Sequence, residues 1–366
     1  MRTCPRCKLK YLDSFEKCPA DGAALSSVAA TDPMFGRVLG GRYRLESRIG
    51  EGGMGWVYRA TRTTDDTQVA VKLLIARSDE RGREHRERFR REVGMLGRLR
   101  HPNVVSMLDA GEENGQAYMV MEYLQGRTLH DVVPAGGVPV RAAADIIQEV
   151  CEGLEAAHRA GLVHRDLKPE NVFIARQATG VHVVKIIDFG LARATDVDEE
   201  SRLTQQGKVV GSAGYIAPEH ILGSRDFTPA SDIYAVGAVL FFMLAGRRPY
   251  EGDSVGAVME AQVKERLPPL GLPQGHPSLV LEPVIRRAMS RQLDRRFPST
   301  RDLGRTVEEL LRASRGDRPI TTEIEGLTVI RQVRRLGRSW VPQVAAATAG
   351  AGIGFGLLGL AWWLLR

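Results

Sequence analysis

The sequence predicts an α+β protein with two lobes, a smaller lobe rich in β-strands followed by a larger helical lobe. From Gly36 onward, runs such as RYRLESRI, WVYRAT and TQVAVKLLI alternate apolar and polar residues, which is the period of β-strands. After Gly126 the period becomes helical, and the longest patterns cover residues 142–160, 231–244 and 281–288. Clefts between two such lobes commonly hold ligands, so a functional site is expected at their border.

Two local patterns complete the strand-rich lobe. Residues 84–99 are charged and amphipathic with the period of a helix. The stretch NVVSMLDAGEENGQAYMVMEYL then returns to two strands around Asn114-Gly115, a pair that favours the tight turn of a hairpin. The smaller lobe is therefore expected to contain one helix among its strands.

Composition places the chain among ordinary globular proteins, with 43% hydrophobic and 26% charged residues. The net charge of +7 is compatible with nucleic acid or an anionic membrane as a partner, and also with a solvated arginine-rich surface. The chain has four cysteines, three of them near the N-terminus, which disfavours a disulfide framework and suits a reducing cytoplasm. Cys151 lies in a helical pattern and is expected to be a buried thiol.

Changes of composition divide the chain into five segments. They are a cysteine-containing module at residues 1–22, a small and polar linker at 23–35, the two-lobed domain at 36–313, a basic connector at 314–339 and an apolar segment at 340–366. No apolar run of signal-peptide type occurs at the N-terminus.

The apolar segment is predicted to be a single transmembrane helix. Val341 to Leu365 carries no charge, and about 20 apolar residues suffice to span a bilayer. Tryptophans stand near its two edges, at Trp340, Trp362 and Trp363. Arginines precede it at Arg331, Arg334, Arg335 and Arg338, which predicts that the N-terminal side stays in the cytoplasm. The alternative is a buried helix of the main domain.

The same segment contains overlapping G-x-x-x-G pairs, formed by Gly350, Gly352, Gly354 and Gly356. Such pairs permit close contact between transmembrane helices, so a homodimer is one expectation. An anchor without a partner helix is the alternative.

A glycine-rich stretch, IGEGGMGWV, lies between two predicted strands. Its members are Ile49, Gly50, Glu51, Gly52, Gly53, Met54, Gly55, Trp56 and Val57. Glycines at this spacing let a backbone turn tightly and present N–H groups to phosphate oxygens. A dinucleotide-binding loop and a plain hairpin have the same spacing, but the former should open a helix, and here a strand follows.

Lys72 lies in the apolar strand VAVKLLI, where an ammonium group needs an anionic partner. Glu92, in the predicted charged helix, can supply that partner and hold the lysine towards nucleotide phosphates. These two residues extend the candidate phosphate site beyond the glycine-rich stretch.

The stretch LVHRDLKPENVF contains the residues that phosphoryl transfer requires. Asp166 can orient and deprotonate an attacking hydroxyl, and Lys168 can steady the transferred charge. Asn171 and the later Asp188, in IIDFG, offer oxygen atoms to a divalent metal. His164 is interpreted as a packed structural histidine.

Together these stretches resemble the eukaryotic-like Ser/Thr protein kinases of bacteria. Six elements stand in the order of that family: IGEGGMGWV, VAVK with Glu92, HRDLKPEN, DFG, APE and SDIYAVG. The resemblance covers about residues 35–313 and implies the two-lobed kinase fold. It also implies ATP with Mg²⁺ or Mn²⁺ as cofactors, and proteins as substrates. The sequence Lys168-Pro169-Glu170 favours Ser/Thr over Tyr as the acceptor.

The resemblance assigns roles to single residues. Residues 49–57 would cover the ATP phosphates, and Lys72, held by Glu92, would contact them. Asp166 would be the catalytic base, Lys168 would contact the transferring phosphate, and Asn171 and Asp188 would hold magnesium. Further positions are implied to bind adenine through the backbone (Glu122 and Leu124, after Met121), to form an ion pair (Glu219 with Arg296) and to brace the catalytic loop (Asp232).

The loop between DFG and APE carries the expected regulation. In the family, an arginine such as Arg165 often pairs with a phosphorylated residue there, and Thr204 stands where the family places its phosphothreonines. Thr204 is therefore the candidate autophosphorylation site. One departure is Gly211-Ser212, where the family usually has Gly-Thr, and the serine keeps the hydroxyl.

The N-terminal module resembles the minimal zinc ribbons that head some bacterial kinases. Cys4 and Cys7 form a C-x2-C half, and Cys18 and Asp21 form a matching C-x2-D half. A carboxylate can bind zinc, and a module of this size has little core without a metal. A site of three thiolates with water and a metal-free loop are the alternatives.

The sequence therefore predicts a single-pass kinase of the bacterial inner membrane, with its kinase domain in the cytoplasm and a role in signalling. A small-molecule kinase would lack the Lys168-to-Asn171 spacing and the APE stretch. A zinc-dependent nucleic-acid binder would need more basic and aromatic patterning in the module, so no nucleic-acid partner is expected.

Overall fold

The computed structural model describes a defined part of the chain. Described are residues 2–3, 10–11, 17–19, 22–23, 26–27, 32–52, 55–74, 93–177, 179–189, 213–264, 267–314, 323–324 and 327–328. The chain divides into two compact units, Met1–Ile330 and Arg331–Arg366, and all described residues belong to the first.

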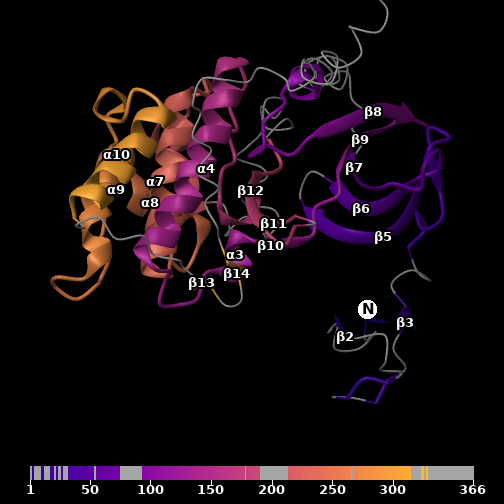
Figure 1. Ribbon diagram of the computed structural model, residues 1–366, viewed down its shortest axis with the longest axis horizontal. Helices are drawn as coiled ribbons and strands as arrows, with labels where there is room; N and C mark the ends of the chain where they lie inside the picture. The colour runs from indigo at the N-terminus through magenta and orange to yellow at the C-terminus, as the bar shows by residue number, and fades with distance from the viewer. Residues whose placement is uncertain are drawn as a thin grey trace, which may run out of the picture. The chain divides into compact units, whose positions relative to one another are not determined.

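The strand-rich lobe is built on an antiparallel six-stranded sheet (Figure 1). In spatial order its strands are β4 (Val38–Leu39), β5 (Tyr43–Gly52), β6 (Gly55–Arg62), β7 (Gln68–Leu74), β9 (Gln116–Glu122) and β8 (Met107–Glu113). Asn114 and Gly115 both have positive φ angles, 52° and 76°, and join β8 to β9 as the predicted hairpin turn. The apolar positions of β5, β6, β7 and β9 form one core, with Leu45, Tyr58, Val69 and Val120 among its members.

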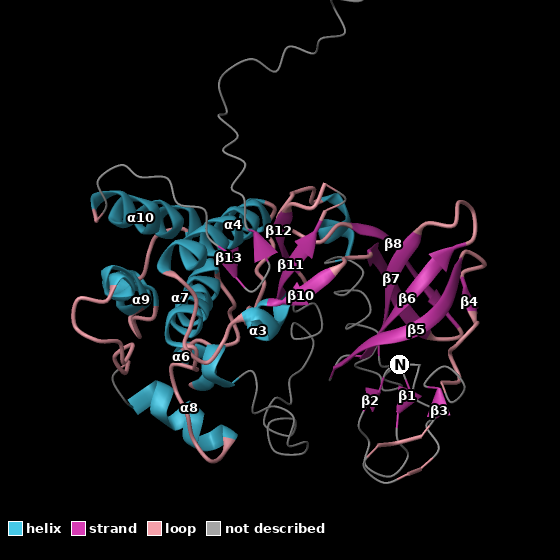
Figure 2. Cartoon of the chain, turned by 60° about the horizontal axis from the view of Figure 1, so that its bottom comes forward, coloured by secondary structure: helices cyan, strands magenta, loops and turns pink. Residues whose placement is uncertain are grey.

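The helical lobe begins with β10 (Gly126–Thr128) and contains the remaining long helices (Figure 2). Its first elements are α3 (Leu129–Val132), α4 (Val140–Arg159), η1 (Pro169–Asn171), β11 (Val172–Arg176) and β12 (His182–Ile186). After the gap at residues 190–212 come η4 (Ala213–Tyr215), α6 (Pro218–Ile221), α7 (Pro229–Ala245) and α8 (Val255–Lys264). The last are η5 (Pro277–Leu281), α9 (Glu282–Ala288), η6 (Leu293–Arg295) and α10 (Thr300–Ala313). The three predicted helical patterns are confirmed as α4, α7 and α9.

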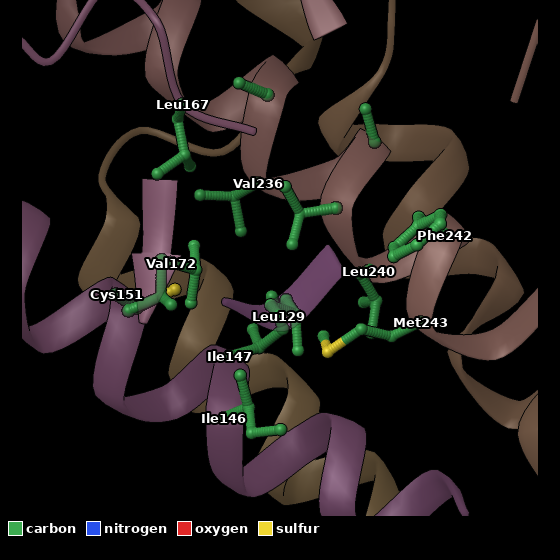
Figure 3. Close-up of a cluster of buried hydrophobic side chains, with 14 of the residues drawn as sticks. Leu129, Ile146, Ile147, Cys151, Leu167, Val172, Val236, Leu240, Phe242 and Met243 are labelled. Carbon is green, nitrogen blue, oxygen red and sulfur yellow. The ribbon is translucent and has the colours of Figure 1, made fainter. Parts of the chain in front are cut away.

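Helix α7 is buried on nearly all sides, and this explains why its sequence is almost continuously apolar. At its start the Thr228 N–H donates to the Ser231 hydroxyl at 3.4 Å, and at its end Gly246, with φ of 66°, adopts the left-handed conformation that favours glycine. Figure 3 shows side chains of α4 and α7 meeting in the core, with Ile147 and Cys151 from α4 and Leu240 from α7. Cys151 is 1% exposed, so the predicted buried thiol is confirmed.

Antiparallel strands β10, β11 and β12 form a small sheet beside the catalytic sequence. Because η1 runs directly into β11, and Asp188 follows β12 by two residues, this sheet fixes the two ends of the candidate site. The predicted helix over residues 84–99 is helical in its described part, residues 93–98.

Short strands also occur near both ends of the first unit. Near the N-terminus β1 (Arg2–Thr3) pairs antiparallel with β2 (Lys10–Tyr11) and with β3 (Ser26–Ser27), and β13 (Glu323–Ile324) pairs with β14 (Leu327–Thr328). Of the four predicted zinc ligands only Cys18, which is buried, belongs to the described residues. Among those described residues, no group of three or more His, Cys, Asp or Glu side chains is placed to hold a metal ion.

The predicted transmembrane segment at residues 340–366 lies outside the described residues. In the part of the chain that the structure does describe, no helix combines the length and the apolar character needed to cross a bilayer.

Candidate active site

The predicted catalytic residues converge in the loop between α4 and β11. Lys168 Nζ lies 3.0 Å from Asp166 Oδ2, and both side chains are mostly buried. The Asn171 amide nitrogen donates to the backbone oxygen of Asp166 at 2.7 Å. Pro169 begins η1 and restricts the backbone between these residues. The loop therefore holds a carboxylate, an ammonium group and an amide within one short segment.

Asp232, on α7, supports this loop from the helical core. Its carboxylate is 1% exposed and accepts the backbone N–H groups of His164 at 2.8 Å and Arg165 at 3.0 Å. His158 Nε2, at the end of α4, donates to the same carboxylate at 2.7 Å. Burial alone would raise the pKa of Asp232, but the hydrogen bond from His158 and the neighbouring donors lower it below its ordinary value. Asp232 is therefore a buried, ionised carboxylate bonded to the catalytic loop, as its predicted bracing role requires.

Arg165 has a φ of 68°, which is uncommon for a residue with a side chain. The hydrogen bond from its backbone N–H to Asp232 lies at this strained position, so Asp232 holds the turn that presents Asp166.

His164 occupies the structural position expected from the sequence. It is 0% exposed, its Nε2–H donates to the backbone oxygen of Ile187 at 3.0 Å, and its ring lies 4.7 Å from that of Phe189. Burial lowers the pKa of His164 below its ordinary value, which keeps the imidazole neutral. His164 therefore links the catalytic loop to the segment that carries Asp188.

Lys72 reaches across from β7 to the helical lobe. Its Nζ lies 2.8 Å from Asp188 Oδ1, and its side chain is 8% exposed. Glu92, the partner expected from the sequence, lies outside the described residues. Asp188, with φ of 55°, is held in the left-handed region directly after Ile187.

The oxygen atoms of Asn171 and Asp188 fit a divalent cation of the magnesium type. Asn171 uses its amide nitrogen towards Asp166, which leaves its carbonyl oxygen as the atom that can face a metal. Asp188 uses Oδ1 towards Lys72 and has a second carboxylate oxygen. A carboxylate and an amide oxygen are hard ligands that suit Mg²⁺ or Mn²⁺.

The glycine-rich stretch forms the end of the β5–β6 hairpin, with Gly52 paired to Gly55 in the ladder. Gly55 has φ of 145°, and a Cβ there would overlap the backbone carbonyl of Leu73, so only glycine fits. Ile49 is 48% exposed and Val57 is partly buried. Gly53 and Met54, at the tip, lie outside the described residues.

Apolar side chains of both lobes form a separate cluster beside the segment that joins them. Ala70, Val105 and Met121 are its buried members, and Val57, Tyr123, Leu124 and Ile187 pack against them. Apolar side chains of this kind suit the faces of an adenine ring. The sequence had pointed to Met121, Leu124 and Val57, and Ala70 and Ile187 lie in the quoted VAVK and IIDFG stretches, whereas Val105 carries no pattern that distinguishes it from other core residues.

Glu122 anchors the connection between the lobes. Its side chain accepts the Ser106 backbone N–H and the Lys185 ammonium group, both at 2.7 Å. Its own backbone N–H donates to the backbone oxygen of Ser106 at 3.0 Å. Lys185, on β12, was not singled out from the sequence.

The predicted ion pair between Glu219 and Arg296 is present, with Arg296 Nη2 2.7 Å from Glu219 Oε2. The Arg296 side chain is fully buried and also donates to the backbone oxygens of Ala230 and Ser290. This pair fixes the end of the activation segment against α7. Thr204, the predicted phosphorylation site, lies outside the described residues.

An apolar cluster between two lobes, a glycine-rich hairpin, a buried lysine and a loop with a carboxylate are the features expected of a class of enzyme, the two-lobed phosphotransferases. Comparison with known proteins narrows this class. The protein kinase domain family matches residues 43–324, so the chain belongs to the protein kinase family.

The similar proteins of known sequence are bacterial serine/threonine-protein kinases. PknA of Mycobacterium tuberculosis is 43% identical over 246 residues, which cover 65% of this chain and 54% of PknA. The probable kinase PknB of Corynebacterium glutamicum is 44% identical, over 62% of this chain and 35% of PknB. Pkn3 of Myxococcus xanthus is 39% identical, over 71% of this chain and 48% of pkn3. The chain thus spans between about a third and a half of these relatives, and its domain is of their serine/threonine kind.

Solved structures agree on the fold. A crystal structure of the PknI kinase domain of Mycobacterium tuberculosis, a double mutant, superposes with a TM-score of 0.59 at 27% identity. The match covers 75% of this chain and 98% of the PknI domain. The predicted two-lobed kinase fold is therefore confirmed.

Proposed function

We propose that this protein is a serine/threonine-protein kinase that transfers the γ-phosphate of ATP to hydroxyl groups of proteins and acts in bacterial signalling. The observation that carries the proposal is the convergence of Asp166, Lys168 and Asn171 in one braced loop, opposite the Lys72–Asp188 pair. Membership of the kinase family and the serine/threonine kinases among its relatives support it.

The residues of the site divide the work of the reaction. Asp166 orients a serine or threonine hydroxyl and takes up its proton as the oxygen forms a bond to the γ-phosphorus. The bond between that phosphorus and the β–γ bridging oxygen breaks, and ADP leaves. Lys168, beside Asp166, lies where a positive charge can steady the transferring group. A magnesium ion at Asn171 and Asp188 would neutralise phosphate charge.

Nucleotide binding is assigned mainly to the strand-rich lobe. Lys72 would contact the phosphates beneath the glycine-rich hairpin of residues 49–57. Glu122 and Leu124 would offer backbone groups to adenine, since both lie in the segment that joins the two lobes and Leu124 packs against the apolar cluster of Ala70, Val105 and Met121. In the active arrangement Lys72 would pair with Glu92 and would give up the contact with Asp188 that it makes in this structure.

A transfer assay with the full chain, γ-labelled ATP and a generic protein acceptor tests this function. Label on serine and threonine, dependent on Mg²⁺ or Mn²⁺, is the expected result. Label only on tyrosine, or only on small-molecule acceptors, would contradict the proposal.

For the C-terminal segment we propose a transmembrane anchor in the bacterial inner membrane, with the kinase domain on the cytoplasmic side. The uncharged run from Val341 to Leu365 and the arginines before it support this. Fractionation of cells expressing the full chain, with and without residues 340–366, tests it. We expect the full chain in the membrane fraction and the shortened chain outside it. The G-x-x-x-G pairs of the segment favour a dimer of such helices, which crosslinking of the full chain in membranes would test.

For residues 1–22 we propose a zinc ribbon with Cys4, Cys7, Cys18 and Asp21 as ligands. The three short strands β1, β2 and β3 form one sheet, and the two halves of the ligand set fall between them in sequence. At the second half, the Gly22 N–H donates to the Cys18 oxygen at 2.9 Å, and the Cys18 N–H donates to the Ala23 oxygen at 2.8 Å. Metal analysis of the full chain, with Asp21→Ala as the comparison, should find zinc that the variant holds less tightly.

Thr204 is proposed as the autophosphorylation site, since it precedes the APE segment as in related kinases. Mass spectrometry after incubation with ATP should find phosphate on Thr204 in the wild type and none in Asp166→Asn. An active enzyme with unmodified Thr204 would rule the site out.

A further inference from the structure

Asp32 stands immediately before the kinase domain and contacts both strands of the glycine-rich hairpin, through a hydrogen bond with β6 and a longer ion pair with β5. Its carboxylate accepts the Tyr58 hydroxyl at 2.9 Å and the Met34 N–H at 2.9 Å, and lies 3.8 Å from Arg48 Nε. The Asp32 side chain is only 8% exposed. A carboxylate this buried is held in place by its partners, so it is more than a residue of a polar linker.

The two partners of Asp32 are neighbours in the sheet. Arg48 on β5 and Tyr58 on β6 are register partners, and therefore lie on the same face of the hairpin. Between them and the glycine-rich tip the ladder is irregular, with a shift between the Arg48 and Gly50 pairs that leaves Ile49 without a cross-strand partner. Asp32 thus ties the two strands together directly below an interruption of the ladder.

The contact continues towards the tip. Arg48 Nη1 lies 3.8 Å from Glu51 Oε2, and Glu51 belongs to the glycine-rich stretch. The segment after Asp32 is itself fixed along β5. The Gly36 N–H donates to the backbone oxygen of Leu45 at 2.8 Å, and the Leu45 N–H donates to the backbone oxygen of Arg37 at 2.9 Å. A chain of polar contacts therefore runs from the end of the linker to the residues that are assigned to the ATP phosphates.

We propose that Asp32 is a positioning residue for ATP binding, which clamps the Arg48–Tyr58 pair and so sets the position of the glycine-rich hairpin. The proposal rests on the assignment of residues 49–57 to the ATP phosphates. It makes the segment that links the N-terminal module to the kinase domain a part of the nucleotide site. Burial and the hydrogen bond to Asp32 raise the pKa of Tyr58 to about 12, which keeps its hydroxyl a donor throughout the physiological range.

The chain contains a matched control for Tyr58. Tyr43, at the start of β5, donates its hydroxyl to Asp109 at 2.7 Å, in the same sheet but away from the glycine-rich tip. The two tyrosines are equally buried, at 2% and 3% exposure. Tyr58→Phe and Tyr43→Phe each remove one hydroxyl that is bonded to a carboxylate, so a general loss of stability would affect both variants alike.

The test compares KM for ATP and kcat of the full chain and its variants. We expect Tyr58→Phe to raise KM for ATP about fivefold with kcat within about twofold, and Tyr43→Phe to change neither by more than about twofold. Equal KM values for the two variants would overturn the proposal. Arg48→Gln, at a partly exposed position that tolerates change, should also raise KM for ATP, and an unchanged value would count against it.

A double variant gives a second readout. If Asp32 acts through Tyr58, the double variant with Asp32→Asn and Tyr58→Phe should have the same KM for ATP as Asp32→Asn alone. A double variant in which the two increases in KM multiply would contradict the clamp. The assignment of the site itself fails separately: a wild type that binds no ATP would overturn both ideas. A wild type and a Tyr58→Phe variant that bind ATP equally well would overturn only the clamp.

Discussion

The catalytic loop and the glycine-rich hairpin lie on opposite sides of the candidate site and are held in different ways. The catalytic loop stands on Asp232, a carboxylate with 1% exposure, and on His164 with none. The hairpin ends near the surface, with Ile49 48% exposed. Its polar support begins at the buried Asp32 and Tyr58 and continues to Arg48 and Glu51, which are partly or largely exposed. The comparison teaches that the buried core supports the whole catalytic loop, whereas the support of the hairpin weakens from its buried base towards its exposed glycine-rich end.

This difference suits the two tasks. A base must be placed accurately with respect to the attacking hydroxyl, so its support should cost much to disturb. A cover over a nucleotide must open to release ADP, so its supports should be weak enough to break within the catalytic cycle.

The largest effect is expected at Asp232. Asp232→Ala removes the acceptor of two backbone N–H groups and of His158, so we expect a loss of about 3–5 kcal/mol in the free energy of unfolding and loss of transfer activity. Denaturant unfolding measures the former. The control is Asp145→Ala, which removes another buried carboxylate of the helical lobe, paired with Arg141. A Asp232→Ala variant as stable as this control would show that the catalytic loop has no special support.

Lys72→Met tests the other region, where we expect activity to fall without a loss of stability. Removal of a phosphate-binding lysine should lower the transfer rate at least about 100-fold. Met fills a similar volume, and the Asp188 carboxylate that loses its partner is 35% exposed and can be solvated, so the free energy of unfolding should change by less than about 1 kcal/mol. Assays of transfer and of thermal unfolding on the same sample separate the two. A strongly destabilised variant would mean that the Lys72–Asp188 pair supports the fold rather than the nucleotide site.

Glu149, on α4, gives an effect on stability that appears only when the pH is changed. Its carboxylate accepts the Asn103 side chain at 2.7 Å and the Val184 N–H at 2.9 Å, and burial raises its pKa to about 7. Between the ordinary value of 4.5 and about pH 7 the folded state holds a proton that the unfolded state has lost. Stability should therefore fall as pH rises through this window, by up to about 3 kcal/mol.

Glu149→Gln keeps the shape and cannot titrate, so it is the variant that checks this prediction. Unfolding followed from pH 4.5 to 7.5 should show the wild type losing stability relative to the variant as pH rises. Parallel profiles for the two proteins would contradict the raised pKa.

Much of this site could be predicted from the sequence because its residues stand in short, ordered stretches. Asp166, Lys168 and Asn171 lie within one loop. The helix α4 follows from its periodic apolar residues, and α7 was expected from a long, almost continuous apolar run. The Glu219–Arg296 pair joins residues far apart in sequence and was expected only through the family resemblance. Similar long-range contacts without such a resemblance stayed hidden.

His158, Lys185 and Asp32 illustrate what the sequence could not reveal. His158 is one polar residue near the end of a helix, and nothing local links it to Asp232 on α7. Asp32 was part of a stretch with linker composition, and its burial depends on Tyr58, which the sheet brings to the same face as Arg48. Tertiary contacts between single side chains have no period and no fixed spacing, so only the structure reveals them.

The central claim, that the loop around Asp166 transfers phosphate to serine and threonine, is tested most directly by comparing the full chain with its Asp166→Asn variant. Transfer from γ-labelled ATP to a generic protein is measured, with ATP affinity and thermal unfolding determined on the same preparations. We predict label on serine and threonine with the wild type and about a thousandfold slower transfer with the variant, at unchanged ATP affinity and stability. A variant that transfers phosphate as fast as the wild type would contradict the account.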